Sequence, residues 1–194
     1  METTDDADVE WLFKSLEQLP EPEAEPSIIV VSGLPGTGKS YFSAKLAERL
    51  PAKILESDGL RKSFFPQPTY SSSESSRLFR VIHLLIKRLL KRGIPLILDA
   101  TNLSEHDRER LYSIAERLSA KLILVQVVAP PAVVYRRLKA RTAGLNQRDK
   151  SDADWQVYQR MKNSVQKIRR NHFVVDTSQD IEPALDKIVR EARR

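Results

Sequence analysis

Residues 33–40 of the chain read GLPGTGKS and match the pattern G-x-x-x-x-G-K-[ST] at every fixed position. An apolar stretch at 28–32 leads into this motif, and a helical pattern over 39–50 follows it. Between a strand and a helix, such a glycine-rich turn points its backbone N–H groups at phosphate oxygens, beside the positive end of the helix. We therefore predict that the motif binds a nucleoside triphosphate through Gly33, Leu34, Pro35, Gly36, Thr37, Gly38, Lys39 and Ser40.

The two polar residues that close the motif indicate the cofactors. Lys39 is expected to reach the β- and γ-phosphates, and the hydroxyl group of Ser40 is expected to bind Mg²⁺. The predicted cofactors are therefore ATP or GTP together with Mg²⁺. A glycine-rich turn with a chance lysine is the alternative, but three of the six glycines of the chain lie within these eight residues.

Beyond residue 26, apolar stretches typical of buried strands alternate with helical patterns. The expected strands cover 28–32, 53–56, 94–99, 121–128 and 173–176, and the expected helices cover 39–50, 58–65, 72–92, 104–118, 132–141, 155–170 and 181–193. Such alternation predicts an α/β fold in three layers, with a five-stranded parallel sheet between helices and right-handed crossover connections. We predict that these elements form a single P-loop domain over residues 27–194.

Residues 1–26 differ from the rest of the chain in charge. They hold nine acidic residues and one lysine, whereas the remaining residues carry an excess of 14 positive charges. Val9, Leu12 and Phe13 fall at helical spacing, so we predict a short helix that packs on the domain, followed by a stiff linker rich in proline and glutamate. An arm that imitates nucleic acid, or a simply solvated acidic segment, is the alternative.

The basic body suits a polyanionic partner such as nucleic acid, although any enzyme that handles ATP tends to be basic. No apolar run approaches the roughly 18 residues that a membrane span needs, and the chain has no cysteine. The acidic N-terminus lacks the features of a secretory leader. We therefore expect no membrane partner and a cytoplasmic location, while the sequence leaves the oligomeric state open.

A carboxylate follows the second expected strand in the segment ESDGLR. Asp58 is placed to accept the proton of an acceptor hydroxyl group, because ligands of parallel sheets bind at the carboxyl ends of the strands. Arg61 lies one helical turn later and could hold an acceptor phosphate. The alternative is that Asp58 only caps the helix that follows it.

Polar residues also follow the third expected strand, in the segment DATN. Asp99 is predicted to orient the water shell of Mg²⁺, and Thr101 and Asn102 are predicted to bind the acceptor or to brace the loop. Ser104, with Asp107 three residues later, resembles a capping box at the start of the next helix. Asn102 and Ser104 could instead serve only the turn and the helix start.

Two arginines four residues apart lie on one face of the expected helix 132–141. Arg137 and Arg141, followed by a polar stretch with Gly144 and Arg148, suit a helical lid that closes over the triphosphate and stabilises charge on the transferred phosphoryl group. A solvated basic helix face is the alternative. The position of His83 in a mostly apolar helix indicates a structural role.

The ordered segments GLPGTGKS, SDGLR, LDATNL and RRLKAR resemble the bacterial "predicted kinase" group of P-loop proteins over nearly all of residues 27–190. That group is similar to the phage-type polynucleotide 5′-hydroxyl kinase and, more distantly, to zeta toxins and chloramphenicol phosphotransferase. The resemblance implies the strand order 2-3-1-4-5. It also implies that Asp58 is the general base, that Arg61 contacts an acceptor phosphate, and that Arg137 and Arg141 grip the phosphates. The phage motif is Asp-Thr-Asn, whereas Ala100 here separates Asp99 from Thr101.

The resulting hypothesis is an ATP-dependent kinase with Lys39, Asp58, Arg137 and Arg141 as catalytic residues and the 5′-hydroxyl group of a polynucleotide as acceptor. A small-molecule kinase acting on an antibiotic, a nucleotide-sugar or a metabolite is the first alternative. A regulatory module that binds ATP without an acceptor reaction is the second. The sequence does not choose among acceptors, and it leaves the role of residues 1–26 open.

Overall fold

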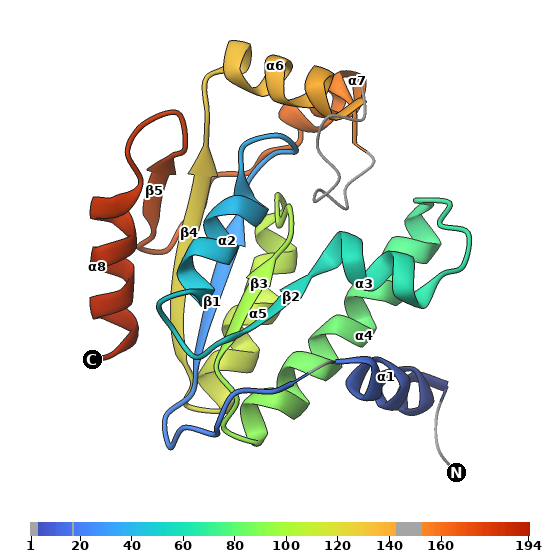
Figure 1. Ribbon diagram of the computed structural model, residues 1–194. Coiled ribbons are helices and arrows are strands. Elements are labelled where there is room, and N and C mark those ends of the chain that lie inside the picture. The colour runs from blue at the N-terminus through green and yellow to red at the C-terminus, as the bar shows by residue number, and fades with distance from the viewer. Residues whose placement is uncertain (1–3, 17, 143–152) are drawn as a thin grey trace.

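The computed structural model describes residues 4–16, 18–142 and 153–194, and its centre is a five-stranded parallel sheet (Figure 1). The strand order is β2-β3-β1-β4-β5, which confirms the predicted order. The strands are β1 (Ser27–Ser32), β2 (Lys53–Glu56), β3 (Leu96–Asp99), β4 (Lys121–Val128) and β5 (Phe173–Asp176). Every residue of β1 is buried, as expected for a central strand covered on both faces.

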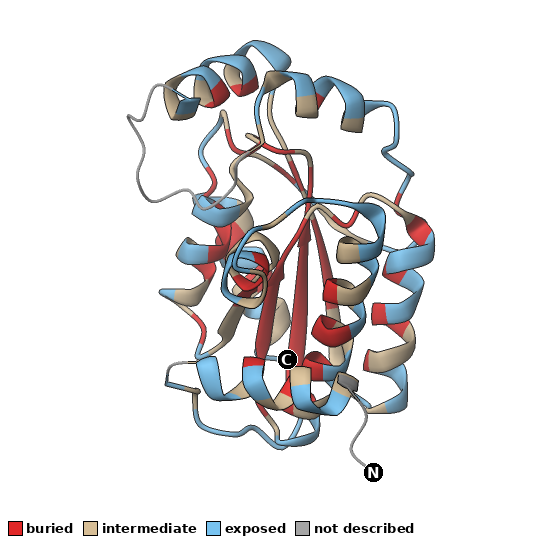
Figure 2. Cartoon of the chain, turned by 90° about the vertical axis from the view of Figure 1, so that its right-hand side faces the viewer, coloured by how far each residue is buried: buried red, intermediate tan, exposed pale blue. Residues whose placement is uncertain are grey.

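Helices cover both faces of the sheet and form the outer layers (Figures 1 and 2). They are α1 (Thr4–Ser15), α2 (Lys39–Ala47), α3 (Ser57–Phe64), α4 (Ser72–Lys91), α5 (Glu105–Arg117), α6 (Pro131–Thr142), α7 (Trp155–Lys162) and α8 (Glu182–Ala192). Apolar residues of α2 and α8 form one core with one face of the sheet, and those of α1, α4 and α5 form another core with the opposite face. The three-layer α/β architecture is therefore confirmed.

The parallel sheet brings the ends of distant strands to one edge. β1 pairs with β3 and β4, with Val31 opposite Asp99 and Ser32 opposite Gln126. The segments that follow β1, β2, β3 and β4 therefore all leave the same edge of the sheet, where α6 and α7 lie above it in Figure 1. This edge is where ligands bind in open parallel sheets.

The N-terminal helix α1 packs on α4, as the sequence predicts. Leu12 is completely buried and belongs to the core that α4 and α5 share. Acidic side chains of α1 pair with basic side chains of α4: Asp8 with Arg77 at 2.7 Å, Asp5 with Arg80 at 3.0 Å, and Glu10 with Arg88 at 2.6 Å. Part of the negative charge of the first 26 residues is therefore neutralised by basic residues of α4.

The predicted helix over 155–170 is too long, because α7 ends at Lys162. Beyond Lys162, the backbone makes hydrogen bonds to distant segments in place of a continued helix. The backbone N–H of Gln166 donates to the carbonyl of Leu103 at 2.9 Å, and the buried side chain of Arg108 donates to the carbonyl of Gln166 at 2.8 Å. Ile168 is buried in the core beside α5. These bonds hold residues 163–172 as an irregular connecting segment between α7 and β5.

Among the helices in the described ranges, none combines the length and the apolar character that a membrane-spanning segment would need.

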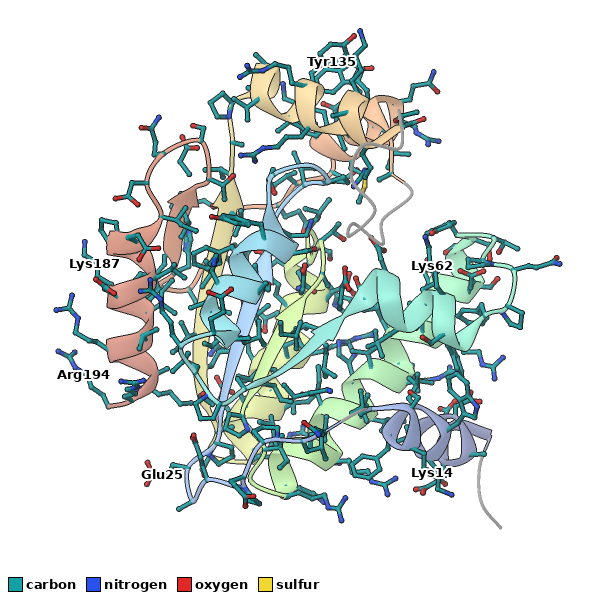
Figure 3. The ribbon with its side chains drawn as sticks, viewed as in Figure 1. Lys14, Glu25, Lys62, Tyr135, Lys187 and Arg194 are labelled. Carbon is teal, nitrogen blue, oxygen red and sulfur yellow. The ribbon has the colours of Figure 1, made fainter. Side chains whose placement is uncertain are left out.

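We expect Leu12→Ala to lower the free energy of unfolding by about 2–5 kcal/mol, because it removes a fully buried side chain from the main core. Urea denaturation of the full chain measures this loss. Lys14→Ala is the matched control on the same helix, since the Lys14 side chain is 74% exposed and points outward in Figure 3. Equal stability of the two variants would contradict the integration of α1 into the domain.

Candidate active site

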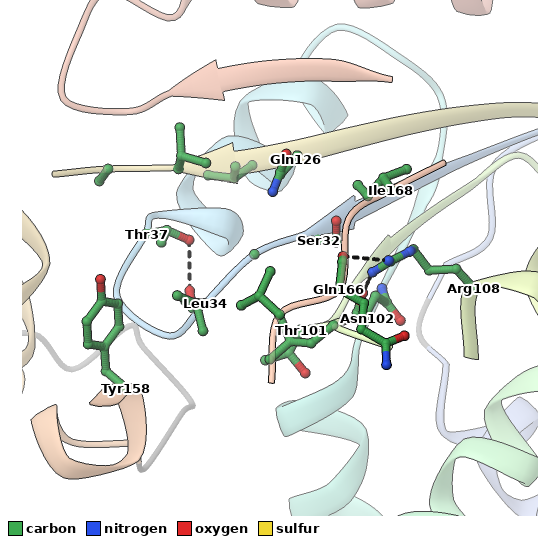
Figure 4. Close-up of a pocket in the computed structure, with 16 residues that line it drawn as sticks. Ser32, Leu34, Thr37, Thr101, Asn102, Arg108, Gln126, Tyr158, Gln166 and Ile168 are labelled. Atoms are coloured by element: carbon green, nitrogen blue, oxygen red, sulfur yellow. Dashed lines mark hydrogen bonds between the residues drawn. The ribbon is translucent and has the colours of Figure 1, made fainter. Parts of the chain in front are cut away.

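The backbone of residues 33–40 forms a compact loop between β1 and α2. Thr37 donates to the carbonyl of Leu34 both from its backbone N–H at 3.3 Å and from its hydroxyl group at 2.8 Å (Figure 4). The Lys39 ammonium group donates to the same carbonyl at 3.3 Å, so the lysine folds back over the loop. Gly38 precedes the first residue of α2 with a φ of 94°. The loop therefore presents backbone N–H groups and a lysine at the start of a helix, which is a phosphate-binding arrangement.

At two glycines of this loop, the neighbouring side chains leave no room for a Cβ atom. A Cβ atom on Gly36, which has a φ of 77°, would lie 2.9 Å from side-chain carbons of Leu138 on α6. A Cβ atom on Gly38 would lie 3.0 Å from the hydroxyl oxygen of Thr177 and 3.3 Å from Arg137. The shape of the loop thus depends on close contact with α6 and with the turn after β5, in addition to the positive φ angles.

Arg137 and Thr177 brace the loop from the side opposite β3. The Arg137 guanidinium donates to the hydroxyl of Thr177 at 2.8 Å, to the carbonyl of Thr177 at 2.9 Å and to the carbonyl of Thr37 at 3.3 Å. The Thr177 hydroxyl in turn donates to the carbonyl of Thr37 at 2.5 Å. Arg137 therefore lies directly on the phosphate-binding loop, within reach of groups bound there.

Arg141, the second predicted lid arginine, donates to the carbonyl of Ala153 just before α7. It thus links α6 to α7, and within the described ranges its hydrogen-bond partner differs from the partners of Arg137. Buried Val134, Leu138 and Tyr158 pack α6 and α7 together, with Leu34 of the loop against them. The two helices form a layer over the loop, and their action as a lid stays a prediction. Gly144 and Arg148 lie outside the described residues.

Asp99 ends β3 on the sheet face that carries α2. It lies two residues after Ile97, which belongs to the core beside α2 and α8, and its register partner on β1 is Val31 of the same core. Glu56 at the end of β2 pairs in register with Asp99, so a second carboxylate lies at the same edge. Ser40 lies in the first turn of α2 and is exposed.

These residues fit Mg²⁺ bound mainly through phosphate oxygens and water. No group of three or more His, Cys, Asp or Glu side chains within the described ranges could hold a metal ion on its own. Mg²⁺ commonly keeps several waters and uses one or two protein oxygens together with substrate phosphates. The Ser40 hydroxyl and the Asp99 carboxylate supply oxygens of this kind.

Asp58 lies in the first turn of α3, immediately after β2, and is half-buried. Its carboxylate makes no hydrogen bond or ion pair with the part of the chain that the structure describes, so it is available to a ligand. Only β3 separates β2 from β1, which places the carboxyl ends of these two strands roughly 10 Å apart at the usual strand spacing. Asp58 does not occupy the N-cap position, which is Glu56.

Arg61 is engaged by protein groups. Its guanidinium is buried, pairs with Glu74 of α4, donates to the hydroxyl of Ser75 at 3.2 Å and lies 4.9 Å from the ring centre of Tyr70. Burial acts to raise the pKa of Glu74, but hydrogen bonds from Thr69 and from Arg61 outweigh it and lower the pKa to about 2. A charged Glu74 therefore holds Arg61 and the α3–α4 loop in place, and direct contact of Arg61 with an acceptor would require this pair to open.

The loop after β3 joins the phosphate-binding loop. The backbone N–H of Gly33 donates to the carbonyl of Thr101 at 3.1 Å. Asn102 is buried with a φ of 46°, a conformation that asparagine tolerates, and its carbonyl accepts from Arg108. Asn102 therefore braces the loop, whereas the Thr101 side chain lines a cavity of about 90 Å³ beside residues 33–37 (Figure 4).

The predicted capping box at Ser104 does not form. Ser104 occupies the N-cap position of α5 without a side-chain bond to the helix, and the Gln166 side chain accepts from the N–H of Glu105 at 2.7 Å instead. The structural interpretation of His83 fits its surroundings: burial, and then the positive charge of Arg110, lower its pKa to about 4.

The sequence gives no signal for three residues that shape the site. Thr177 reaches the phosphate-binding loop because β5 lies beyond β4, and Glu56 reaches Asp99 through the β2–β3 register. Arg108 contributes to the site because residues 163–172 lie beside α5 and accept hydrogen bonds from its side chain. Each contact depends on strand order or on a connection far away in sequence.

Comparisons with known proteins give a consistent set of relatives. A family model described as AAA domain matches residues 28–168. The chain is similar to the L-seryl-tRNA(Sec) kinase of Methanococcus maripaludis, with 29% identity over 115 residues. This alignment covers 57% of the chain and 44% of that protein, so the chain spans less than half the length of this relative.

Solved structures share the fold. The APS kinase of Mycobacterium tuberculosis, solved with AMPPNP and APS, gives a TM-score of 0.65 at 17% identity, with 89% of this chain and all of that chain covered (100%). A gluconokinase of Sinorhizobium meliloti gives 0.58 at 23% identity, with 88% of this chain and 91% of that chain covered. At these identities the likeness concerns the fold.

We expect Thr177→Val to weaken the binding of an ATP analogue by about 5- to 30-fold. The variant keeps the shape of the side chain but removes the hydroxyl that bonds Thr37 and Arg137, and one or two such bonds contribute roughly 1–2 kcal/mol. Isothermal titration with AMPPNP and Mg²⁺ measures the effect. Thr177→Ser, which keeps the hydroxyl, is the matched control and should bind nearly as the wild type; equal losses in both variants would argue against the bracing role.

Proposed function

The chain belongs to the AAA domain family, and from that premise we propose that it is a kinase that transfers the γ-phosphoryl group of ATP to a hydroxyl group. One observation carries this proposal. A complete phosphate-binding loop follows β1, and a half-buried carboxylate with no bond to the described residues, that of Asp58, follows β2 at the same edge of the sheet. A domain that only binds nucleotide has no need for this second feature.

On the donor side, N–H groups of residues 36–40 hold the phosphates at the start of α2. Lys39 exchanges its bond to the Leu34 carbonyl for the β- and γ-phosphates, and Arg137 extends from the side of the loop toward the developing charge. Bound Mg²⁺ would neutralise phosphate charge, with Ser40 and Asp99 as the protein groups that hold it or its water shell. Arg141 would add charge stabilisation after releasing the Ala153 carbonyl.

On the acceptor side, Asp58 accepts a hydrogen bond from the acceptor hydroxyl and takes its proton during transfer. A bond forms between the acceptor oxygen and the γ-phosphorus, the bond from that phosphorus to the β–γ bridging oxygen breaks, and ADP leaves. Thr101 lines the adjacent cavity and could bind the acceptor, while Asn102 keeps the loop in shape. Arg61 acts here through Glu74 by fixing the loop between α3 and α4.

We further propose that the acceptor hydroxyl belongs to a nucleic acid, with the 5′-hydroxyl group as the first candidate. The body of the chain is strongly basic, and α6 and α7 contain six basic residues and no acidic one. The relative from Methanococcus maripaludis bears the name of a kinase for an RNA-linked serine. The pairing of Arg61 with Glu74 favours the second candidate, a small-molecule acceptor without a phosphate at that position.

We expect γ-labelled ATP to label a 5′-hydroxyl RNA or DNA oligonucleotide, with activity that falls steeply as salt rises because phosphate contacts are screened. The same oligonucleotide with a 5′-phosphate is the matched control and should stay unlabelled. Seryl-tRNA and gluconate complete the panel. Transfer to gluconate alone, with little dependence on salt, would replace the nucleic-acid acceptor by a small molecule and leave the kinase proposal in place.

We expect Asp58→Asn to lower kcat by about 10²- to 10⁴-fold, because general-base catalysis contributes this much. AMPPNP affinity should change little, because Asp58 makes no hydrogen bond or ion pair with the phosphate-binding loop within the described residues. Asp107→Asn, an exposed acid in the first turn of α5, is the control and should keep full activity. Unchanged turnover in Asp58→Asn would remove the kinase mechanism; so would the absence of any transfer in the wild type, in favour of a regulatory module.

A further inference from the structure

Among the residues that the structure describes, Arg108 on α5 is the most deeply buried charged side chain that the proposed mechanism does not use. It is 2% exposed, and its ion-pair partner Glu105 is 8% exposed. The Arg108 Nε atom donates to Glu105 at 2.7 Å, and one terminal nitrogen donates to the carbonyls of Gln166 and Lys167 at 2.8 and 3.2 Å. The other terminal nitrogen donates to the carbonyl of Asn102.

These bonds join two segments that are far apart in sequence. One is the loop after β3, where the carbonyl of Thr101 is bonded to Gly33 of the phosphate-binding loop. The other is the connecting segment 163–172, which follows α7. Gln166 strengthens the connection from its side, because its N–H donates to Leu103 at 2.9 Å and its side chain accepts from the N–H of Glu105 at 2.7 Å.

The connecting segment also leads to the lid layer. It follows α7 directly, and Tyr158 of α7 packs against Val134 and Leu138 of α6, whose side chains contact Gly36. A closed path of contacts therefore runs from the phosphate-binding loop through Thr101, Arg108 and Gln166 to α7 and α6, and back to the loop. Figure 4 shows Thr101, Asn102, Arg108 and Gln166 together around the cavity beside this loop.

A buried guanidinium needs all its partners in place, because an unpaired charge in the interior is strongly unfavourable. An apolar side chain could fill the same space without fixing the carbonyls of Asn102 and Gln166 relative to each other. We infer that Arg108 is a positioning residue that couples the loop after β3, on the acceptor side, to the segment behind the lid. This inference rests on the proposed function for its catalytic meaning, but the coupling itself is a property of the fold.

Hydrogen–deuterium exchange with and without AMPPNP and Mg²⁺ tests the coupling without an acceptor. In the wild type, AMPPNP should protect residues 33–40, 101–104 and 163–170 together. In Arg108→Lys, which keeps the charge but cannot reach every carbonyl, protection of 33–40 should persist. Exchange in 101–104 and 163–170 should rise by about three- to tenfold per lost hydrogen bond, and the response of both segments to AMPPNP should disappear.

Two further variants separate coupling from stability. Gln166→Ala changes an exposed residue, should fold normally, and should weaken the response of 101–104 in the same direction. Leu89→Ala, at the far end of α4, destabilises the core without touching the path and should keep the response. With an acceptor that becomes labelled in the γ-labelled ATP experiment, Arg108→Lys should raise the acceptor KM or lower kcat at least about tenfold, with ATP affinity nearly unchanged.

Several results would overturn the inference. One is a wild-type response to AMPPNP confined to 33–40, and another is an unchanged response in both Arg108→Lys and Gln166→Ala. Equal loss in Leu89→Ala would show a general effect of stability. Failure to bind AMPPNP at all would refute the proposed function instead; the effect of Arg108→Lys on exchange in 101–104 and 163–170 without nucleotide would then still decide the coupling.

Discussion

The backbone of residues 33–40 must keep its N–H groups turned toward a bound phosphate, and the other parts of the site are arranged around that requirement. Three residues of the loop are glycines, so within the described structure only Thr37 and Lys39 contribute side-chain hydrogen bonds within it, both to the carbonyl of Leu34. Neighbouring elements supply further support: α6 packs on Gly36, Arg137 and Thr177 bond the carbonyl of Thr37, and the carbonyl of Thr101 accepts from Gly33. None of these bonds uses the N–H groups of residue 36 or of residues 38–40, which are the groups expected to face a phosphate.

The order of the strands explains how these elements reach the loop. β1 is central, β3 brings Asp99 and Thr101 to one side, and β4 and β5 bring α6 and Thr177 to the other. Asp58 arrives from β2, one strand beyond β3, at a spacing that leaves room for an acceptor between it and the phosphates. In the proposed mechanism, the division into a donor side and an acceptor side therefore follows from the sheet topology. The helix α1 packs on α4 through its buried Leu12 and so supports the sheet face that α4 covers.

The sequence predicts those features that local pattern determines. The apolar run before GLPGTGKS is β1, the alternation of patterns is the three-layer sandwich, and the resemblance of the motifs supplies the strand order. The sequence does not predict which groups the charged side chains pair with. Arg61 pairs with Glu74, and α7 ends at Lys162, because residues distant in sequence offer better contacts than solvent or a continued helix. Thr177 and Arg108 carry no motif, since their positions follow from the fold alone.

The central claim is that one edge of the sheet holds a triphosphate and a reacting oxygen between the phosphate-binding loop and Asp58. A crystal structure of the full chain with AMPPNP and Mg²⁺ tests it most directly. The account predicts that the γ-phosphate lies against the N–H groups of residues 36–40 and that the Asp58 carboxylate faces it across a gap that admits one hydroxyl group. The distance from the carboxylate oxygen to the phosphorus should be roughly 5–6 Å, which is the sum of one hydrogen bond to the hydroxyl and one near-attack distance from the hydroxyl to the phosphorus. An Asp58 side chain directed away from the nucleotide, or a nucleotide bound elsewhere, would contradict it.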